Sequence, residues 1–125
     1  MLKISSSLEN YLESILMIQK DQKKTRIKDI ASFLNVKAPS VIEAMEHLKS
    51  KKLIKQEPYG SIELTKEGEK TAKKVYEKHC ILRRFLTQVL HVDPKTAEID
   101  ACNMEHIVSK RTLNAILKHI KSINK

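Results

Sequence analysis

Apolar side chains recur every three or four positions along most of the 125-residue chain, and polar side chains fill the positions between them. This spacing gathers the apolar residues on one face of a helix, where they can pack against a core. Residues 53–57 and 61–65 are predicted to be strands instead, and Pro58-Tyr59-Gly60 between them is a turn signal. Helices are predicted over residues 5–20, 27–34, 39–51, 65–90, 94–108 and 110–123.

Polar residues at the expected helix starts support these boundaries, because a side-chain oxygen can accept a hydrogen bond from an otherwise unpaired backbone N–H. The candidate caps are Ser6 or Ser7, Thr65, Asp93 and Ser109. Pro39 and Pro94 are each placed at the first position of a helix, where the missing N–H has no energetic cost. Only two glycines and three prolines occur in the chain, so a mainly α fold is expected.

The first half of the chain has the pattern of a helix-turn-helix, with helices 27–34 and 39–51 joined by a tight turn. Their expected inward residues are Ile30, Ala31, Phe33, Leu34, Val41, Ile42, Met45 and Leu48. An outward polar stripe on the second helix, as a DNA-reading helix has, consists of Ser40, Glu43, His47 and Lys51. With the following hairpin as a wing, residues 1–65 are predicted to form a winged helix-turn-helix domain.

The second half is expected to be helical throughout. On its long helix, His79 lies on or beside the apolar face, where a charged imidazole would be costly. The helix over 94–108 is apolar over more than one face, as a helix at a dimer interface would be. Residues 66–125 are therefore predicted to form a helical dimerisation domain, in which Cys80 is a small core residue.

The composition narrows the range of partners. Lysine and arginine total 24 against 15 acidic residues, which gives a formal net charge of +9 and a pI near 9.6. This excess points to a polyanionic partner, first nucleic acid and second an anionic membrane surface. Hydrophobic residues make up 41% of the chain, enough for a packed core, so disorder is not expected.

No apolar run approaches the roughly 20 residues of a transmembrane helix, and Met1-Leu2-Lys3-Ile4-Ser5 does not have the apolar core of a signal peptide. The protein is therefore expected in the cytoplasm, without a membrane partner. In that compartment Cys80 and Cys102 should stay reduced and available as thiols.

Cys102, Glu105 and His106 stand at positions i, i+3 and i+4. In a helix, these three side chains leave the same face about one turn apart. Thiolate, carboxylate and imidazole together suit a borderline divalent ion such as Fe(II), Zn(II) or Mn(II). The alternative is a buried cysteine beside a surface Glu–His pair, and the three residues alone leave both interpretations open.

Six local motifs stand out in the order of the chain. They are Glu9-Asn10-Tyr11-Leu12-Glu13-Ser14-Ile15, Ile30-Ala31-x-x-Leu34, Pro39-Ser40-Val41, Leu64-Thr65-x-x-Gly68, His79-x-x-Leu82-x-x-Phe85-Leu86 and Cys102-x-x-Glu105-His106. With the order of the elements, these motifs resemble the metal-dependent transcriptional repressors of the diphtheria toxin repressor and manganese transport regulator family. The resemblance extends from Leu8 to about Leu113.

The resemblance implies a homodimer that binds a divalent metal ion and then binds double-stranded operator DNA. The family's ligand positions, on the first, long and fifth helices, are held here by Asn10, Glu13, His79, Cys102, Glu105 and His106. The iron branch of the family has a cysteine at the place of Cys102, and the manganese branch has a carboxylate at the place of Glu13. This hybrid set implies Fe(II) or Mn(II) as the cofactor, and the thiolate argues mildly against Mn(II).

Several features depart from the family pattern. Asn10 stands where the branches carry methionine or aspartate, and its amide oxygen is a weaker ligand than a carboxylate. Arg83 and Glu98 stand where the iron branch has ligands of a second metal site. A cation at position 83 would repel a metal ion, so that second site is not expected and Glu98 is expected to be solvated. The iron branch's C-terminal domain has no counterpart, which makes the expected architecture closer to the manganese branch.

Residues of the reading helix and basic residues near it are the candidate DNA contacts. Contacts to base edges, which specify sequence, are expected from Pro39, Ser40, Glu43 and His47. Contacts to phosphates, which add affinity without sequence information, are expected from Arg26, Lys37, Lys49, Lys51 and Lys55. The alternative for each basic residue is a solvated surface charge.

The expected mechanism is linkage between the metal and DNA sites. One ion would join the first helix to the two later helices and fix the two reading helices of the dimer one DNA turn, ~34 Å, or a multiple apart. The protein would then be a metal-dependent repressor of metal homeostasis genes and not an enzyme. Two alternatives are a winged-helix regulator with no metal requirement and a small metallo-hydrolase with an open coordination position.

Overall fold

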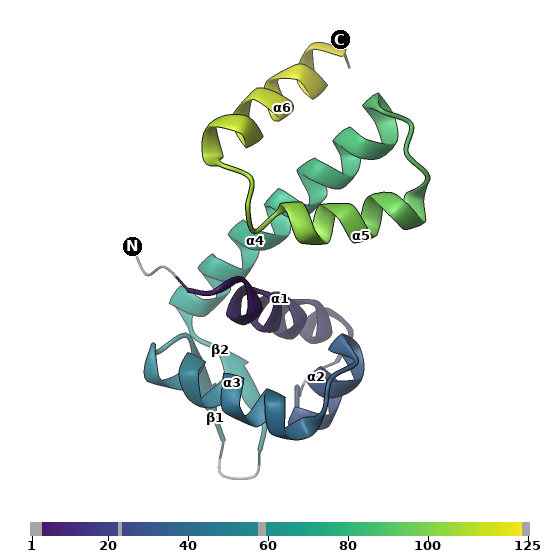
Figure 1. The fold of residues 1–125 in the computed structure, drawn as a ribbon. Coiled ribbons are helices and arrows are strands. Elements are labelled where there is room, and N and C mark those ends of the chain that lie inside the picture. Colours follow the sequence, from purple (N-terminus) through teal and green to yellow (C-terminus); the bar gives the residue numbers. More distant parts are fainter. Residues whose placement is uncertain (1–3, 23, 58–59, 124–125) are drawn as a thin grey trace. The chain divides into compact units, whose positions relative to one another are not determined.

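Six α-helices, a short π-helix and a two-stranded sheet make up the described residues 4–22, 24–57 and 60–123 of the computed structural model (Figure 1). The mainly α fold expected from the sequence is confirmed. Two compact units divide the chain, residues 1–73 and 74–125. None of the helices in the described ranges is long and apolar enough to cross a membrane.

The first unit contains α1 (Ser6–Asp21), α2 (Ile27–Leu34), α3 (Ala38–Ser50), β1 (Ile54–Gln56), β2 (Ile62–Leu64) and the start of α4 (Lys66–Arg84). The two strands are antiparallel, with Ile54 opposite Leu64. Ile62 donates its N–H to the carbonyl oxygen of Thr25 at 2.7 Å, which ties the hairpin to the segment before α2. This order of helix-turn-helix and hairpin is the predicted winged helix-turn-helix.

The turn between α2 and α3 lets both helices pack against α1. Asn35 ends α2 in the left-handed conformation (φ 55°, ψ 51°), and the N–H of Val36 then donates to the carbonyl oxygen of Ala31 at 3.0 Å. This C-terminal cap satisfies a helix carbonyl and redirects the chain. The core that results is mainly aliphatic, and its fully buried side chains include Leu12, Ile15, Ile30, Val41, Met45, Leu48 and Leu53.

Two residues that were expected to face inward are exposed, Phe33 by 53% and Ile42 by 50%. A helix turns by about 100° per residue, so Ile42 points well away from the buried Val41 that precedes it. Phe33 likewise lies at the edge of the arc centred between Ile30 and Leu34. The prediction was wrong for these residues because both helices are short and bury only a narrow stripe.

The helix starts agree with the sequence except at α1 and α3. Ser5 caps α1, in place of the expected Ser6 or Ser7, and its Oγ accepts the N–H of Leu8 at 3.2 Å. α3 begins at Ala38, one residue before Pro39. The other caps are confirmed: Thr65 accepts the N–H of Gly68 at 3.0 Å, Asp93 that of Thr96 at 3.0 Å, and Ser109 that of Thr112 at 3.1 Å.

The strands of the hairpin are each one residue shorter at both ends than predicted. Gly60 has φ 91°, a conformation that glycine adopts without a steric penalty. Its N–H donates to the carbonyl oxygen of Glu57 at 2.9 Å. Pro58 and Tyr59, the rest of the predicted turn, lie outside the described residues.

The second unit contains the C-terminal part of α4, the π-helix η1 (Phe85–Val89), α5 (Pro94–Met104) and α6 (Lys110–Ile123). Both α5 and α6 pack against η1 (Figure 1). Small residues on α5 allow this close approach, because Ala97 and Ala101 are fully buried against leucines. The buried cluster consists of Leu82, Leu86, Ala97, Ala101 and Leu113.

Both helices of this unit that flank the connection at 90–93 end earlier than predicted. The α-helical part of α4 stops at Arg84, and the N–H of Leu90 donates to the carbonyl oxygen of Phe85, five residues back, at 3.2 Å. α5, predicted over 94–108, stops at Met104, whose carbonyl oxygen accepts from Ile107 at 3.0 Å and Val108 at 2.9 Å. These bonds close the turn that leads to α6.

Candidate metal centre and DNA-reading helix

His79 lies on α4 with its imidazole between two carboxylates of the second unit. Its Nε2 atom is 2.8 Å from Oε1 of Glu98, and its Nδ1 atom is 3.4 Å from Oε1 of Glu105. The His79 side chain is only 8% exposed, so the inward position expected from the sequence is confirmed. Each ring nitrogen therefore faces its own anionic partner.

Glu105 is fully buried, with 0% of its side chain exposed, which is a costly place for a charge. Its carboxylate oxygens accept no hydrogen bond from the described residues. The contacts at 3.4 Å to His79 and at 4.0 Å to Nε2 of His106 are longer than good hydrogen bonds. A buried carboxylate without a hydrogen-bond donor among the described residues, close to imidazole nitrogens, offers the oxygen and nitrogen ligands that Fe(II) and Mn(II) bind.

The two carboxylates raise the pKa of the His79 imidazole above its ordinary value of 6.5. The close approach of Glu105 is the largest cause, burial opposes it, and the charges of Glu98 and Glu105 add to it. The imidazolium form is therefore favoured. Because a metal ion binds only a deprotonated ring nitrogen, it would have to compete with a proton at Nδ1.

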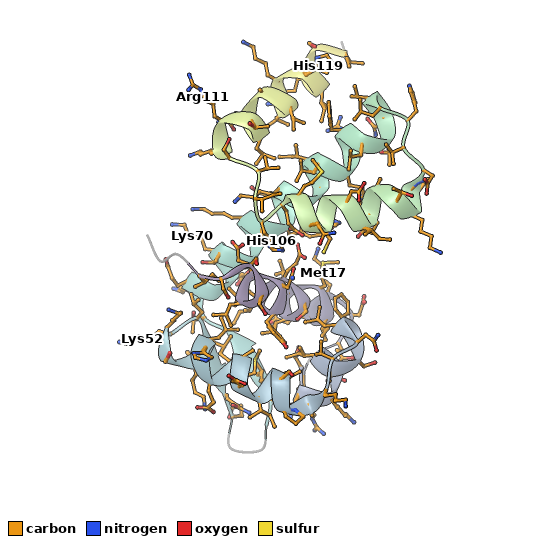
Figure 2. The ribbon with its side chains drawn as sticks, viewed as in Figure 1. Met17, Lys52, Lys70, His106, Arg111 and His119 are labelled. Carbon is orange, nitrogen blue, oxygen red and sulfur yellow. The ribbon has the colours of Figure 1, made fainter. Side chains whose placement is uncertain are left out.

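Cys102 and His106 flank Glu105 at the end of α5. Cys102 is in the last turn of the helix and is partly buried. Glu105 follows the last helical residue, yet it keeps helical dihedral angles (φ −58°, ψ −24°) and donates its N–H to the carbonyl oxygen of Ala101 at 3.0 Å. His106 lies in the turn beyond it (Figure 2), so the expectation that one helix holds all three residues is wrong.

Glu98 is engaged on both oxygens, so the expectation of a simply solvated carboxylate is wrong. Although 53% of its side chain is exposed, Oε1 contacts His79 and Oε2 lies 3.4 Å from Nη1 of Arg83. The sequence could have predicted that Arg83 lies beside His79, because the two residues are four positions apart and so share one face of α4. The partner on α5 could not be found from spacing, since it depends on how the two helices pack.

The two other candidate ligands, Asn10 and Glu13, belong to α1 of the first unit. They stand three positions apart, which places them on the same side of the helix, and both are partly buried. Within the second unit, the structure thus brings Glu105 together with His79 and His106. A contribution from Asn10 and Glu13 to the same ion stays a prediction.

The outward stripe is exposed along α3, as a DNA-reading helix requires, whereas its last member, Lys51, is the C-cap of the helix and is partly buried. Pro39, Ser40, Glu43 and His47 are all accessible to solvent. The last three of them line a hollow of about 500 Å³ between α3 and α1. This hollow is polar along its α3 side, and its residues can donate and accept hydrogen bonds at a base edge.

The basic candidates for phosphate contacts surround this helix in the first unit. Arg26 and Lys37 are exposed at the N-caps of α2 and α3, and Lys51, at the C-cap of α3, is partly buried. Lys49 is paired with Glu46 at 3.3 Å, which reduces the charge it offers to a phosphate. Lys55 is exposed on β1.

Two family models together match nearly the whole chain. The N-terminal DNA binding domain of the iron dependent repressor matches residues 3–62, and its metal binding and dimerisation domain matches residues 65–125. An HTH-type transcriptional regulator of Methanocaldococcus jannaschii is 35% identical over 114 residues, which cover 90% of this chain and 91% of the relative. The chain belongs to the iron-dependent repressor family.

Transcriptional regulators named MntR are among the relatives of this chain. The transcriptional regulator MntR of Escherichia coli O6:H1 is 38% identical over 108 residues, covering 86% of this chain and 69% of the relative. MntR of Bacillus subtilis is 30% identical over 110 residues, covering 88% and 77%. The resemblance to the diphtheria toxin repressor and manganese transport regulator family is therefore confirmed. Its members are metal-dependent DNA-binding regulators of transcription, not enzymes.

Solved structures of the repressor family share the fold. IdeR of T. acidophilum superposes with a TM-score of 0.83 at 21% identity, over 97% of this chain and 56% of that one. The manganese regulator SloR superposes with a TM-score of 0.82 at 27% identity, over 96% and 55%. The chain thus spans about half the length of these solved proteins.

Proposed function

We propose that this protein is a homodimeric repressor that binds operator DNA when it holds a divalent ion, Fe(II) or Mn(II). The observation that carries the proposal is the buried carboxylate of Glu105, which accepts no hydrogen bond from the described residues and faces Nδ1 of His79. A buried anion in that state destabilises the fold until a cation neutralises it. The structural neighbour SloR, which is named a manganese regulator, supports this class of metal.

The proposed ligands come from α1, from α4, and from the end of α5 with the turn that follows it. The second unit would supply His79, Cys102, Glu105 and His106, and α1 would supply Glu13 and Asn10. A bound ion supplies positive charge and directional bonds, for which imidazole and carboxylate groups suit both metals and the thiolate favours Fe(II). In this proposal the ion connects α1 with α4 and α5, and so holds together carboxylates that would otherwise repel one another.

The connection would make metal binding and DNA binding favour the same state. An ion that binds more tightly when the reading helices are correctly spaced must raise the DNA affinity of the protein to the same extent. A coupling free energy of about 1–3 kcal/mol would change the DNA affinity about 5–150-fold. The protein would act in the cytoplasm, where its operator lies.

The proposed reading helix is α3. Its exposed side chains would contact base edges, with Pro39, Ser40, Glu43 and His47 as the candidates. Phosphates would be bound by the basic residues nearby, with Arg26, Lys37 and Lys51 as the candidates. The net charge of +9 supports a partner of this kind.

Exposed apolar side chains of the second unit support the proposed homodimer. Ile99 on α5 is 57% exposed, and Ile107, in the turn that follows, is 82% exposed. Large apolar side chains that a folded unit leaves accessible are candidates for an interaction surface. The family model of the metal binding and dimerisation domain matches these same residues.

A double variant, Cys102→Ala with Glu105→Ala, tests the proposal. DNA fragments selected from a random pool by the metal-loaded protein would be titrated anaerobically with Mn(II), Fe(II), Co(II) or Zn(II) present. The double variant should lose metal-stimulated binding and keep the helical circular dichroism of the wild type. Asp100→Ala, which removes an exposed carboxylate of α5, should respond as the wild type does.

A normal metal response of the double variant would contradict the proposed site. Full DNA binding by the wild-type protein after chelation would instead favour the alternative, a winged-helix regulator with no metal requirement. The same titrations identify the metal that activates binding at the lowest free concentration. Affinity alone would favour zinc in such a test, so the DNA affinities that are compared are those reached when each ion is saturating.

A further inference from the structure

Four charged side chains of the second unit form a continuous series of contacts. Nη1 of Arg83 is 3.4 Å from Oε2 of Glu98, Oε1 of Glu98 is 2.8 Å from Nε2 of His79, and Nδ1 of His79 is 3.4 Å from Oε1 of Glu105. The side chains of Arg83 and Glu98 are about half exposed, whereas those of His79 and Glu105 are buried. The series therefore runs from solvent to the buried carboxylate.

We propose that Glu98 is a positioning residue of the metal centre, which holds the Nε2–H of His79 so that the lone pair of Nδ1 faces Glu105. The inference rests on the proposed function, in which His79 and Glu105 hold the ion. In a neutral imidazole one ring nitrogen carries a hydrogen and the other has a lone pair. The hydrogen bond that one nitrogen makes decides which of the two carries the hydrogen. An ionised carboxylate only accepts hydrogen bonds, so its contact with Nε2 assigns the N–H to that atom.

Arg83 keeps Glu98 in this role. Its guanidinium lies 3.4 Å from Oε2 of Glu98, and this attraction helps to hold the carboxylate with Oε1 against His79. The same cation lies against the second oxygen of Glu98, so it opposes the binding of another positive ion there. Glu98 therefore acts through His79 and is not itself a ligand.

The contact also fixes the plane of the imidazole ring. His79 could rotate about its side-chain bonds if only Nδ1 were engaged, and the ion would then have to select one orientation at a cost in conformational entropy. A hydrogen bond at 2.8 Å on the opposite nitrogen holds the ring before any ion arrives. Such outer contacts of metal-binding histidines typically change metal affinity 10–100-fold when they are removed.

Three variants of the full-length protein test the proposal against a matched control. Mn(II) affinity is measured by competition with a fluorescent chelator, so the readout does not depend on DNA. Glu98→Ala should weaken binding about 10–100-fold, and Arg83→Ala should weaken it less. Glu98→Gln should retain most of the affinity, because the amide oxygen still accepts from Nε2. Asp100→Ala, a loss of the same charge on the same helix, should bind as the wild type does.

A second readout needs no metal. Nitrogen-15 NMR of the metal-free protein, at a pH where His79 is neutral, reports which ring nitrogen carries the proton. The wild type and Glu98→Gln should show the Nε2–H tautomer, whereas Glu98→Ala should shift toward a mixture of the two tautomers.

Unchanged Mn(II) affinity or an unchanged tautomer in Glu98→Ala would overturn the proposal. Equal losses of affinity in Glu98→Gln and Glu98→Ala would also overturn it, because the charge of a ligand would then be what matters. Wild-type protein that binds no divalent metal would overturn the proposed function. The tautomer measurement would still show, in that case, whether Glu98 positions the His79 ring.

Discussion

Nδ1 of His79 lies 3.4 Å from Oε1 of Glu105, and neither side chain is more than 8% exposed. A carboxylate and an imidazole buried at this separation can be neutralised in two ways. The imidazole can take up a proton and form an ion pair, or a cation can bind both groups. The two states exclude each other at Nδ1, so this atom is where protons and a metal ion compete.

The first prediction concerns Glu105→Gln, which keeps the shape of the side chain and removes its charge. Mn(II) at 100 times its dissociation constant should raise the free energy of unfolding of the wild type by about 2.7 kcal/mol. The variant should gain little, because the buried anion that needs the cation is gone. Urea unfolding with and without Mn(II) measures this difference, and Asp100→Asn serves as the control. A variant stabilised as strongly as the control would place the ion elsewhere.

The second prediction is a pH dependence of the metal-free protein. The pKa of His79 is raised above 6.5 in the folded state, chiefly by Glu105, so the folded chain binds this proton more tightly than the unfolded chain. The resulting stability is fully present below pH 6.5 and is lost as the pH rises through the raised pKa. Unfolding in chelator across this range measures it, and His79→Gln should remove this component. If the free energy of unfolding instead rose from pH 6.5 upward, and if His79→Gln removed that rise, the folded state would not raise the pKa of His79.

Metal affinity should have the opposite pH dependence. Below the raised pKa of His79, each ion must displace one proton, so the affinity should increase by up to about tenfold per pH unit until the imidazole is neutral. Competition titrations of Mn(II) at several pH values give the slope. A flat profile across the range would show that His79 is not a ligand.

Local spacing was enough to predict the helices, the caps of α4, α5 and α6, and the helix-turn-helix. Thr65, Asp93 and Ser109 act as caps because a hydrogen bond over three residues needs no information from elsewhere in the chain. The face of a short helix was predicted less well. Phe33 and Ile42 belong to apolar stretches, but the width of the buried arc depends on what packs against it.

Which residues hold a metal ion stays a prediction, and the contacts among the candidate ligands were not predicted from the sequence. The buried position of His79 follows from the apolar face of its helix, whereas its contact with Glu98 depends on the packing of α4 against α5. The end of α5 at Met104 depends on the turn toward α6, so the spacing of Cys102, Glu105 and His106 suggested a longer helix than the chain forms. Non-local packing decides both features.

The fourth prediction concerns Gly68, in the first turn of α4. A Cβ atom at this position would overlap the carbonyl oxygen of Leu53, which is backbone and cannot move aside as a side chain can. Gly68→Ala should therefore lower the free energy of unfolding by about 1–3 kcal/mol or more, although alanine favours helix. Lys66→Ala, at an exposed position of the same turn, should change it by less than about 0.5 kcal/mol. Equal urea midpoints for the two variants would show that the contact relaxes freely.

The last prediction separates phosphate contacts from base contacts in the proposed DNA interface. Each phosphate neutralised contributes roughly 0.9 to the slope of log affinity against log salt, and a dimer carries two copies of each residue. Lys37→Ala should thus lower the slope by about 1.8 and weaken binding to all DNA sequences alike. His47→Ala should leave the slope unchanged and alter the preference among sequences, because a base contact carries sequence information and releases no counterion. Fluorescence anisotropy at several salt concentrations, on selected and scrambled DNA, measures both effects.

Lys95→Ala, which removes the same charge from α5, is the control and should retain the wild-type slope. A flat salt dependence of the wild-type protein would rule out phosphate-dominated binding.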